Sequence, residues 1–251
     1  ESCHTLGQPV GALQVAPLVL MAGPVEELTL HQVRACGRLT QYVVLANICA
    51  MELTVAQIAE QHGRSDRFVQ QAVRSGDLAA LRTVGRLALV DDVAVMAWVR
   101  ALARGRRWSS DVREAAMDLL SNGRTERLSS SERSRLRSRL REMSVVEIAH
   151  AADGLGGGWA RYRVAHVPDL PRVGPSAADM TTLGVVPGEG WMTFVETDDL
   201  DRLEQGHDVI LDADGNLGVV ERPVTTPRPA RLLLDSYLLG DARVSAAAAN
   251  E

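Results

Sequence analysis

The sequence contains no lysine, few aromatic residues and only three cysteines. All 27 basic residues are therefore arginines, which indicates the coding bias of a GC-rich genome. Cys3, Cys36 and Cys49 all precede Met51, with no CxxC pair and no histidine at ligand spacing. This pattern supports neither a disulfide framework nor a zinc site. We predict a protein without metal or cofactor.

Long hydrophobic runs are also missing. The longest apolar stretch, PVGALQVAPLVLMAG, is interrupted by Pro, Gln and Gly. It is shorter than the ~18 to 20 apolar residues that a membrane span requires. A secretion signal would have a basic residue before this stretch, and none is present. We predict a soluble, cytoplasmic protein that does not bind a membrane.

Catalytic motifs are lacking as well. The six histidines are scattered without HxH or HExxH spacing, and no GxSxG or phosphate-binding loop is present. The acidic run TDDLDRLEQ is typical of a solvated helix start. The run from Asp212 to Asn216 lacks the later Glu of a calcium loop and is typical of a hairpin turn. We predict that the chain is not an enzyme.

The net charge of −5 is distributed unevenly along the chain. Residues 51–163 carry 19 arginines and 14 acidic residues, a net charge of +5. Residues 164–251 carry 6 arginines and 15 acidic residues, a net charge of −9. The basic half indicates a polyanionic partner such as nucleic acid, and the acidic half indicates solvent, a basic protein or the basic half itself.

Two short helices are predicted between Thr54 and Gly76. Thr54 is a cap residue, apolar positions follow at helical spacing, and Gly63 ends the first helix. Ser65 caps the second helix, which buries its valines and alanine and ends at Gly76. A short hairpin over residues 81–90 and a third helix capped by Asp91 or Asp92 follow.

This order of elements favours a helix-turn-helix with a wing, in which the second helix enters the major groove of DNA. Gln suits the edge of adenine and Arg that of guanine. Arginines in the hairpin would reach phosphates or the minor groove, and Phe68 would pack on sugars or thymine methyl groups. The predicted DNA-binding residues are Ser65, Arg67, Phe68, Gln70, Gln71, Arg74, Arg82 and Arg86.

The middle of the chain reads as helical. One helix runs from Trp108 to Gly123, and LSSSERSRLRSRLREMSVVEIAHAA reads as one long helix. Its arginines either lie along phosphates or form a solvated face that pairs locally or with the acidic domain. The run GLGGG then indicates a linker. Beyond it, GWMTFVET reads as a strand, DDLDRLEQG as a helix, HDVILDADGNLGVVER as a hairpin and ARLLLDSYLL as a closing helix.

The segment LTVAQIAEQHGRSDRFVQQAVRSGDLAALRTVGRLALVDDVAVMAW resembles the winged helix-turn-helix of excisionase and MerR-type proteins. The resemblance covers about fifty residues and implies that the helix from Asp66 to Ser75 is the recognition helix. Proteins of this type often carry basic residues in the middle of that helix, where this chain has Gln70 and Gln71. That departure implies modest affinity or a need for dimerisation.

The chain from Met51 onward also resembles actinobacterial abortive-infection-type antitoxins of type IV toxin-antitoxin pairs. The stretches GRRWSSDVREAAMDLLSNG, SERSRLRSRLRE, VILDADGNLGVVER and LLLDSYLLGDARVSAAA carry this resemblance. It implies a DNA-binding autorepressor that opposes a nucleotidyltransferase-type toxin.

The predicted fold class is α+β, with an N-terminal winged helix-turn-helix, a helical connector and a small acidic α+β C-terminal domain. Residues 1–50 are predicted to be an extension, either disordered or added by an upstream start site, or else one or two helices packed on the next domain. The remaining parts are the winged helix-turn-helix over 51–105, the connector over 106–153, the linker over 154–175, the acidic domain over 176–245 and the tail over 246–251.

The predicted function is sequence-specific binding of double-stranded DNA by a transcriptional autorepressor, as a dimer or on repeated half-sites. An excisionase-like accessory protein that bends DNA is one alternative. A protein-interaction module that binds an acidic partner is the other.

Overall fold

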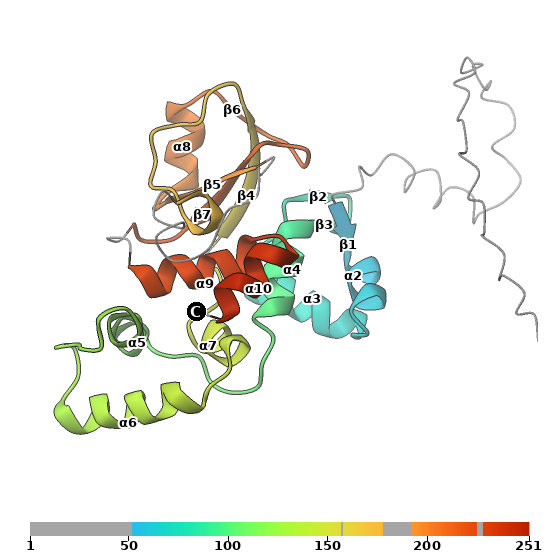
Figure 1. The fold of residues 1–251 in the computed structure, drawn as a ribbon. Helices are drawn as coiled ribbons and strands as arrows, with labels where there is room; N and C mark the ends of the chain where they lie inside the picture. The colour runs from blue at the N-terminus through green and yellow to red at the C-terminus, as the bar shows by residue number, and fades with distance from the viewer. Residues whose placement is uncertain (1–51, 157, 178–191, 225–227, 251) are drawn as a thin grey trace, which may run out of the picture. The chain divides into compact units, whose positions relative to one another are not determined.

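The computed structural model describes residues 52–156, 158–177, 192–224 and 228–250. These described residues lie in one compact unit. Within the described residues there are nine α-helices, one 3-10 helix and two β-sheets (Figure 1). In chain order the elements are β1 (Glu52–Thr54), α2 (Val55–Gln61), α3 (Asp66–Ser75), β2 (Arg82–Val84), β3 (Leu87–Asp91), α4 (Asp92–Arg100), α5 (Ser110–Asn122), α6 (Ser130–Glu142), α7 (Val145–Ala151), β4 (Gly158–Val164), η1 (Gly174–Ser176), β5 (Thr193–Thr197), α8 (Leu200–Gly206), β6 (Val209–Leu211), β7 (Leu217–Glu221), α9 (Pro229–Leu239) and α10 (Ala242–Asn250).

Helix boundaries in the first half follow the capping residues. The Thr54 side chain accepts a hydrogen bond from the N–H of Gln57, whose own side chain bonds back to Thr54 in a capping box. Ser65 caps α3, and Asp91 caps α4 by accepting from two backbone N–H groups. Gly76 ends α3 with φ 78°. These predicted helix starts and this predicted stop are confirmed.

The smaller sheet has the strand order β1-β3-β2 and is antiparallel throughout. The hairpin predicted over residues 81–90 is therefore confirmed as β2 and β3, and β1 adds a third strand beside β3. Leu89 and Val90 are buried on β3. Val90 belongs to the same core cluster as Ile58 and Val69, which joins the first two helices to the hairpin. Helices this short depend on such packing, because they are not stable alone.

The larger sheet has the order β5-β7-β4-β6, with β5 parallel to β7 and the other pairs antiparallel. Its side chains alternate between two faces. Tyr162 and Val195 belong to a small core cluster on one face. Trp159 and Phe194 belong to the main cluster, with ring centroids 6.1 Å apart, and Gly218 leaves room for both rings.

The hairpin predicted over HDVILDADGNLGVVER is wrong, because β6 and β7 do not pair with each other. Both pair with β4, which lies between them. The turn that joins β6 to β7 therefore passes over β4, and Gly215 lies against the backbone of Tyr162. Asn216 completes the crossing, because its side chain bonds both the N–H and the C=O of Val164.

We expect Gly215→Ala to lower the free energy of unfolding by about 1 to 3 kcal/mol, because the added Cβ would overlap the Tyr162 carbonyl. Gly206→Ala is the control, since a Cβ there meets nothing within 4 Å. Urea unfolding followed by circular dichroism measures both. Equal stability of the two variants would contradict the crossing.

The single long helix predicted over LSSSERSRLRSRLREMSVVEIAHAA is also wrong. The structure has two helices, α6 and α7, with Met143 and Ser144 in extended conformation between them. Ser144 caps α7 and forms a capping box with Glu147. A Ser-x-x-Glu sequence starts a helix by satisfying its first N–H groups, and this one starts α7 after a turn in the chain.

The predicted fold class is wrong in its division into a winged helix-turn-helix, a connector and a separate acidic domain. The nine helices and two sheets of the described residues lie in one compact unit. One core cluster contains Ile58 of α2, Met117 of α5, Trp159 of β4 and Leu238 of α9. In Figure 1, α9 lies among the helices that it contacts, which are α4, α5, α7 and α10.

Two further predictions concern chain segments rather than elements. The strand β4 lies inside residues 154–175, which we predicted to be a linker. The predictions for residues 1–50 lie outside the described residues, as does Met51. The individual domain boundaries stay predictions.

Buried ion pairs join the halves of the chain. Arg161 of β4 is fully buried and donates to the Asp91 carboxylate at 3.2 Å and to the Gly215 carbonyl at 2.9 Å. Arg222 donates to Glu196 at 2.7 Å and binds both oxygens of Asp235 on α9. Both pairs bury charge, so loss of one partner would leave the other uncompensated.

The pKa of the Asp91 carboxyl is raised to about 6, because burial outweighs the opposing effect of Arg161. The folded state thus holds this proton more tightly than the unfolded chain does. The contribution to stability is full below the unfolded pKa and declines as the pH rises through about 6. We expect the unfolding free energy of the wild type, relative to Asp91→Asn, to fall by about 2 kcal/mol between about pH 4 and about pH 7. Urea unfolding across this range tests it, and a constant difference would contradict it.

Among the residues that the structure describes, no helix is long and apolar enough to cross a membrane.

Candidate nucleic-acid interface

Helix α3 presents one polar stripe to solvent. Arg67, Gln70, Gln71 and Arg74 are all exposed, and their spacing of three, one and three residues puts them on one side of the helix. Val69 and Ala72 are buried on the opposite side. The structure therefore brings together four of the predicted site residues on one helix face with two positive charges, and exposed Asp66 borders this face in the first turn.

Both ends of α3 are fixed. At the start, Ser65 accepts from the N–H of Phe68 at 3.3 Å. At the end, the chain reverses at Gly76 and the N–H of buried Leu78 donates to the Ala72 carbonyl at 3.1 Å. The Ser75 hydroxyl adds a bond to the Asp77 carboxylate at 2.8 Å. The polar stripe is thus held in one orientation before any ligand arrives.

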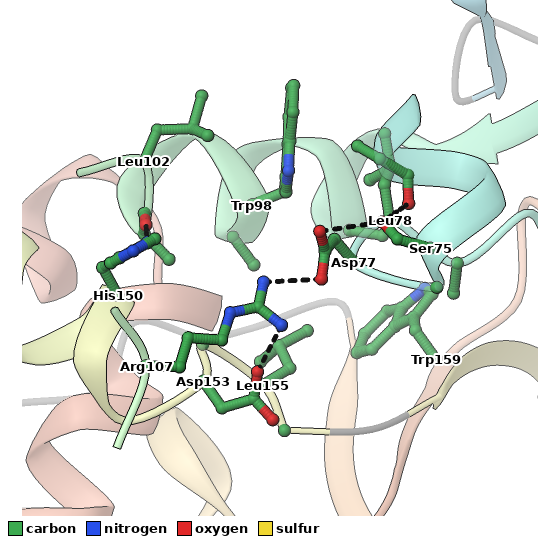
Figure 2. Close-up of a pocket in the computed structure, with 18 of the residues that line it drawn as sticks. Ser75, Asp77, Leu78, Trp98, Leu102, Arg107, His150, Asp153, Leu155 and Trp159 are labelled. Carbon is green, nitrogen blue, oxygen red and sulfur yellow. Dashed lines mark hydrogen bonds and ion pairs between the residues drawn. The ribbon is translucent and has the colours of Figure 1, made fainter. Parts of the chain in front are cut away.

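Asp77 also anchors the turn to a distant part of the chain. Arg107 lies between two carboxylates and forms ion pairs of 2.6 Å with both Asp77 and Asp153 (Figure 2). Asp153 has φ 74°, an uncommon conformation for a residue with a side chain. These two ion pairs connect the end of α3 to the end of α7. They also neutralise the acidic residue nearest to the end of the stripe.

Phe68 is 44% exposed, as the prediction requires for a contact residue. Its ring packs on Trp98 of α4, with centroids 5.7 Å apart. The guanidinium of Arg64 lies 5.8 Å from the same ring. Arg64 precedes the Ser65 cap, is exposed, and was missed by sequence reasoning. The signal for it is its place in the turn that leads into α3.

The two predicted hairpin residues differ in what they can reach. Arg82 is committed to another group, because its guanidinium binds both carboxylate oxygens of buried Glu52, at 2.8 and 2.6 Å. Its charge is therefore largely neutralised, and its first role is to hold β2 to β1. Arg86 lies in the turn between β2 and β3 and is exposed. Of the two, Arg86 is the better candidate for a phosphate contact.

A cavity of about 430 Å³ lies along the other edge of α3. Figure 2 shows this cavity, with Trp98 and Leu102 on one side and Trp159 on another. Alanines and glycines line much of it, and the side chains of Phe68 and Gln71 border it from α3. The small side chains leave this space unfilled. The cavity lies between α3 and the glycine-rich turn after α7.

Among the described residues, no group of three or more His, Cys, Asp and Glu side chains is placed to hold a metal ion. Comparison of the chain with protein-family models, with curated proteins and with solved structures finds no match. The function must therefore be argued from the site itself.

Proposed function

We propose that the chain binds double-stranded DNA in a sequence-specific manner through α3 and represses transcription of its own gene. The observation that carries this proposal is the exposed stripe of Arg67, Gln70, Gln71 and Arg74 on a helix fixed at both ends. The major groove is wide enough for one α-helix, and Arg and Gln are the side chains that pair with guanine and adenine edges.

The surroundings of the stripe support the same role. Arg64 and Arg86 are exposed next to α3 in the chain and at the hairpin turn, where they are available for phosphate oxygens. Phosphate contacts position a protein on the duplex, and base contacts specify the sequence. One short helix reads only a few base pairs, so we propose a homodimer on paired half-sites. Such a protein acts in the cytoplasm.

A mobility-shift experiment tests the proposal with the full chain. The probe is the DNA upstream of its own gene, and unrelated DNA is the competitor. We expect a complex that survives a large excess of unrelated DNA and disappears with unlabelled specific DNA. A complex that both competitors remove equally would contradict sequence-specific recognition.

The antitoxin role rests on the resemblance of the later segments, and we propose it as an extension of DNA binding. A nucleotidyltransferase-type toxin would be the partner. Co-expression with a neighbouring gene of that class is expected to relieve growth arrest caused by the toxin. Arrest that persists in the presence of the chain would contradict this extension and leave DNA binding untouched.

A further inference from the structure

A second groove lies away from α3, between the start of α5 and one face of α6. Its volume is about 640 Å³. Its lining includes Trp108, Glu132, Arg106, Arg107, Arg135 and Arg139. Four of these residues are arginines and one is acidic, so the lining is strongly positive.

The arginines of the groove differ in whether they form salt bridges. Arg107 is held by Asp77 and Asp153. Within the described part of the chain, Arg106, Arg135 and Arg139 form no salt bridge, and all three are exposed. Arg135 and Arg139 are four residues apart on α6 and therefore lie on the same side of that helix. Neither guanidinium group is in a salt bridge, although Glu132 interacts electrostatically with Arg135 and Glu147 with Arg139.

The indole of Trp108 adds a buried donor to the same groove. The residue is 9% exposed, and its Nε1–H has no hydrogen-bond partner among the described residues. Its backbone N–H donates to the Ala151 carbonyl at 2.8 Å, which holds the residue in place. A buried donor without an acceptor costs free energy, so an acceptor from a ligand would remove that cost.

The start of α5 supplies further donors. Ser109 is the N-cap of this 13-residue helix, and its hydroxyl makes no capping hydrogen bond. The first N–H groups of a helix have no partner within the helix and carry partial positive charge. In most helices of the first half a side chain satisfies one of them, as Ser65 does for α3. At α5 the side-chain acceptor is missing at the position that lines the groove.

One carboxylate, that of Glu132, lines the groove, and it is bound to Ser129 rather than to the groove arginines. Glu132 accepts from the N–H and the hydroxyl of Ser129, at 3.1 and 2.6 Å. These bonds keep its pKa below the usual range, with a smaller contribution from Arg135. Glu132 is therefore committed to the start of α6, and Glu147, the acid that interacts with Arg139, is likewise committed to the start of α7 through its bonds to Ser144.

We propose that this groove binds the phosphate group of a ligand. The groove is lined by Trp108, with its unpartnered indole N–H, by Arg106, Arg135 and Arg139, and by the start of α5. A phosphate offers several oxygens that accept charge-assisted hydrogen bonds from different directions. Val112, Leu128 and Leu136 would carry the apolar part of the ligand. The site is separate from the α3 stripe and goes beyond the proposed function.

The indole N–H of Trp108 allows a direct test. The full chain is prepared with isotope-labelled tryptophan, and its four tryptophans give separate indole signals. Trp108→Phe identifies the signal of interest. The probes are inorganic pyrophosphate and, separately, a short DNA duplex, both at constant ionic strength. We expect the Trp108 signal to shift and saturate with one of them.

The variant pair Arg135→Gln with Arg139→Gln removes two groove arginines. We expect it to weaken binding of the active probe by about tenfold or more, because each lost charge-assisted bond costs about that factor. The control pair is Arg124→Gln with Arg141→Gln, which removes the same charge from exposed positions outside the groove lining. The control pair should bind as the wild type does.

The probes distinguish the source of the phosphate. A response to pyrophosphate assigns the groove to a free phosphorylated ligand, and a response to the duplex alone assigns it to the DNA backbone. Either result supports the site if the groove pair loses the response. No shift of the Trp108 signal with either probe, or equal binding by the two variant pairs, would overturn the proposal. Neither result depends on recognition of bases by α3.

Discussion

Arg161→Met is expected to lower the free energy of unfolding by about 3 to 5 kcal/mol, because it leaves a buried carboxylate without its partner. Arg161 is fully buried and binds Asp91 and the Gly215 carbonyl. Asp91 also caps α4. Loss of its partner Arg161 therefore disturbs both the larger sheet and the elements that support α3. Urea unfolding of the two proteins at neutral pH measures the change.

Arg163→Met is the matched control on the same strand. Arg163 is exposed and pairs with Asp212 at the surface, where solvent screening leaves an ion pair with little effect on stability. The double variant Arg161→Met with Asp91→Asn should recover part of the lost stability, because it removes both buried charges. An Arg161→Met protein as stable as the Arg163→Met protein would contradict the buried pair.

The double variant Gln70→Ala with Arg74→Ala is expected to weaken specific DNA binding by about a hundredfold or more. Each base-edge pair contributes about 1 to 3 kcal/mol of discrimination, and the variant removes two candidates. Both side chains are exposed, so the free energy of unfolding should change by less than about 0.5 kcal/mol. Fluorescence anisotropy with labelled DNA measures the affinity, and urea unfolding checks the fold.

Gln205→Ala with Arg243→Ala provides the control for this variant. It removes the same two residue types from exposed positions on α8 and α10, far along the chain from α3. The control should bind DNA as tightly as the wild type. Equal loss in both double variants would mean that net charge, and not the α3 stripe, determines affinity.

Local features of the fold were predictable, because capping depends on residues three or four positions apart. Thr54, Ser65 and Gly76 set helix ends through their own side chains or backbone. The break between α6 and α7 has an equally local cause, the Ser144 capping box, and the sequence pattern was present but was read as one helix. Helix starts can therefore be found from the sequence wherever the capping pair is noticed.

The arrangement of the larger sheet was not predictable in this way. An Asp-Gly turn between two apolar stretches normally joins paired strands, yet β4 lies between β6 and β7. Arg161 on β4 binds Asp91, which lies 70 residues earlier in the chain, and no local pattern in the sequence indicates such a contact. The predicted fold class likewise left out contacts between residues far apart in sequence, such as those that put Ile58 and Leu238 in one core cluster.

In the candidate site too, local features could be predicted from the sequence and contacts between distant residues could not. The stripe on α3 follows from helical spacing alone, so Arg67, Gln70, Gln71 and Arg74 could be predicted. The pairing of Arg82 with Glu52 joins residues thirty positions apart and has no sequence pattern. The unpartnered indole of Trp108 in a basic groove likewise becomes visible only when α5 and α6 are placed together.

The most direct test of base reading by α3 is a specificity profile. The affinity of the full chain is measured for its selected DNA site and for every single-base variant of that site, with the wild type, Gln70→Ala and Arg86→Ala. We expect Gln70→Ala to lose discrimination at one base pair and Arg86→Ala to weaken binding to all sequences alike. Uniform weakening by Gln70→Ala across every sequence would contradict the claim that α3 reads bases.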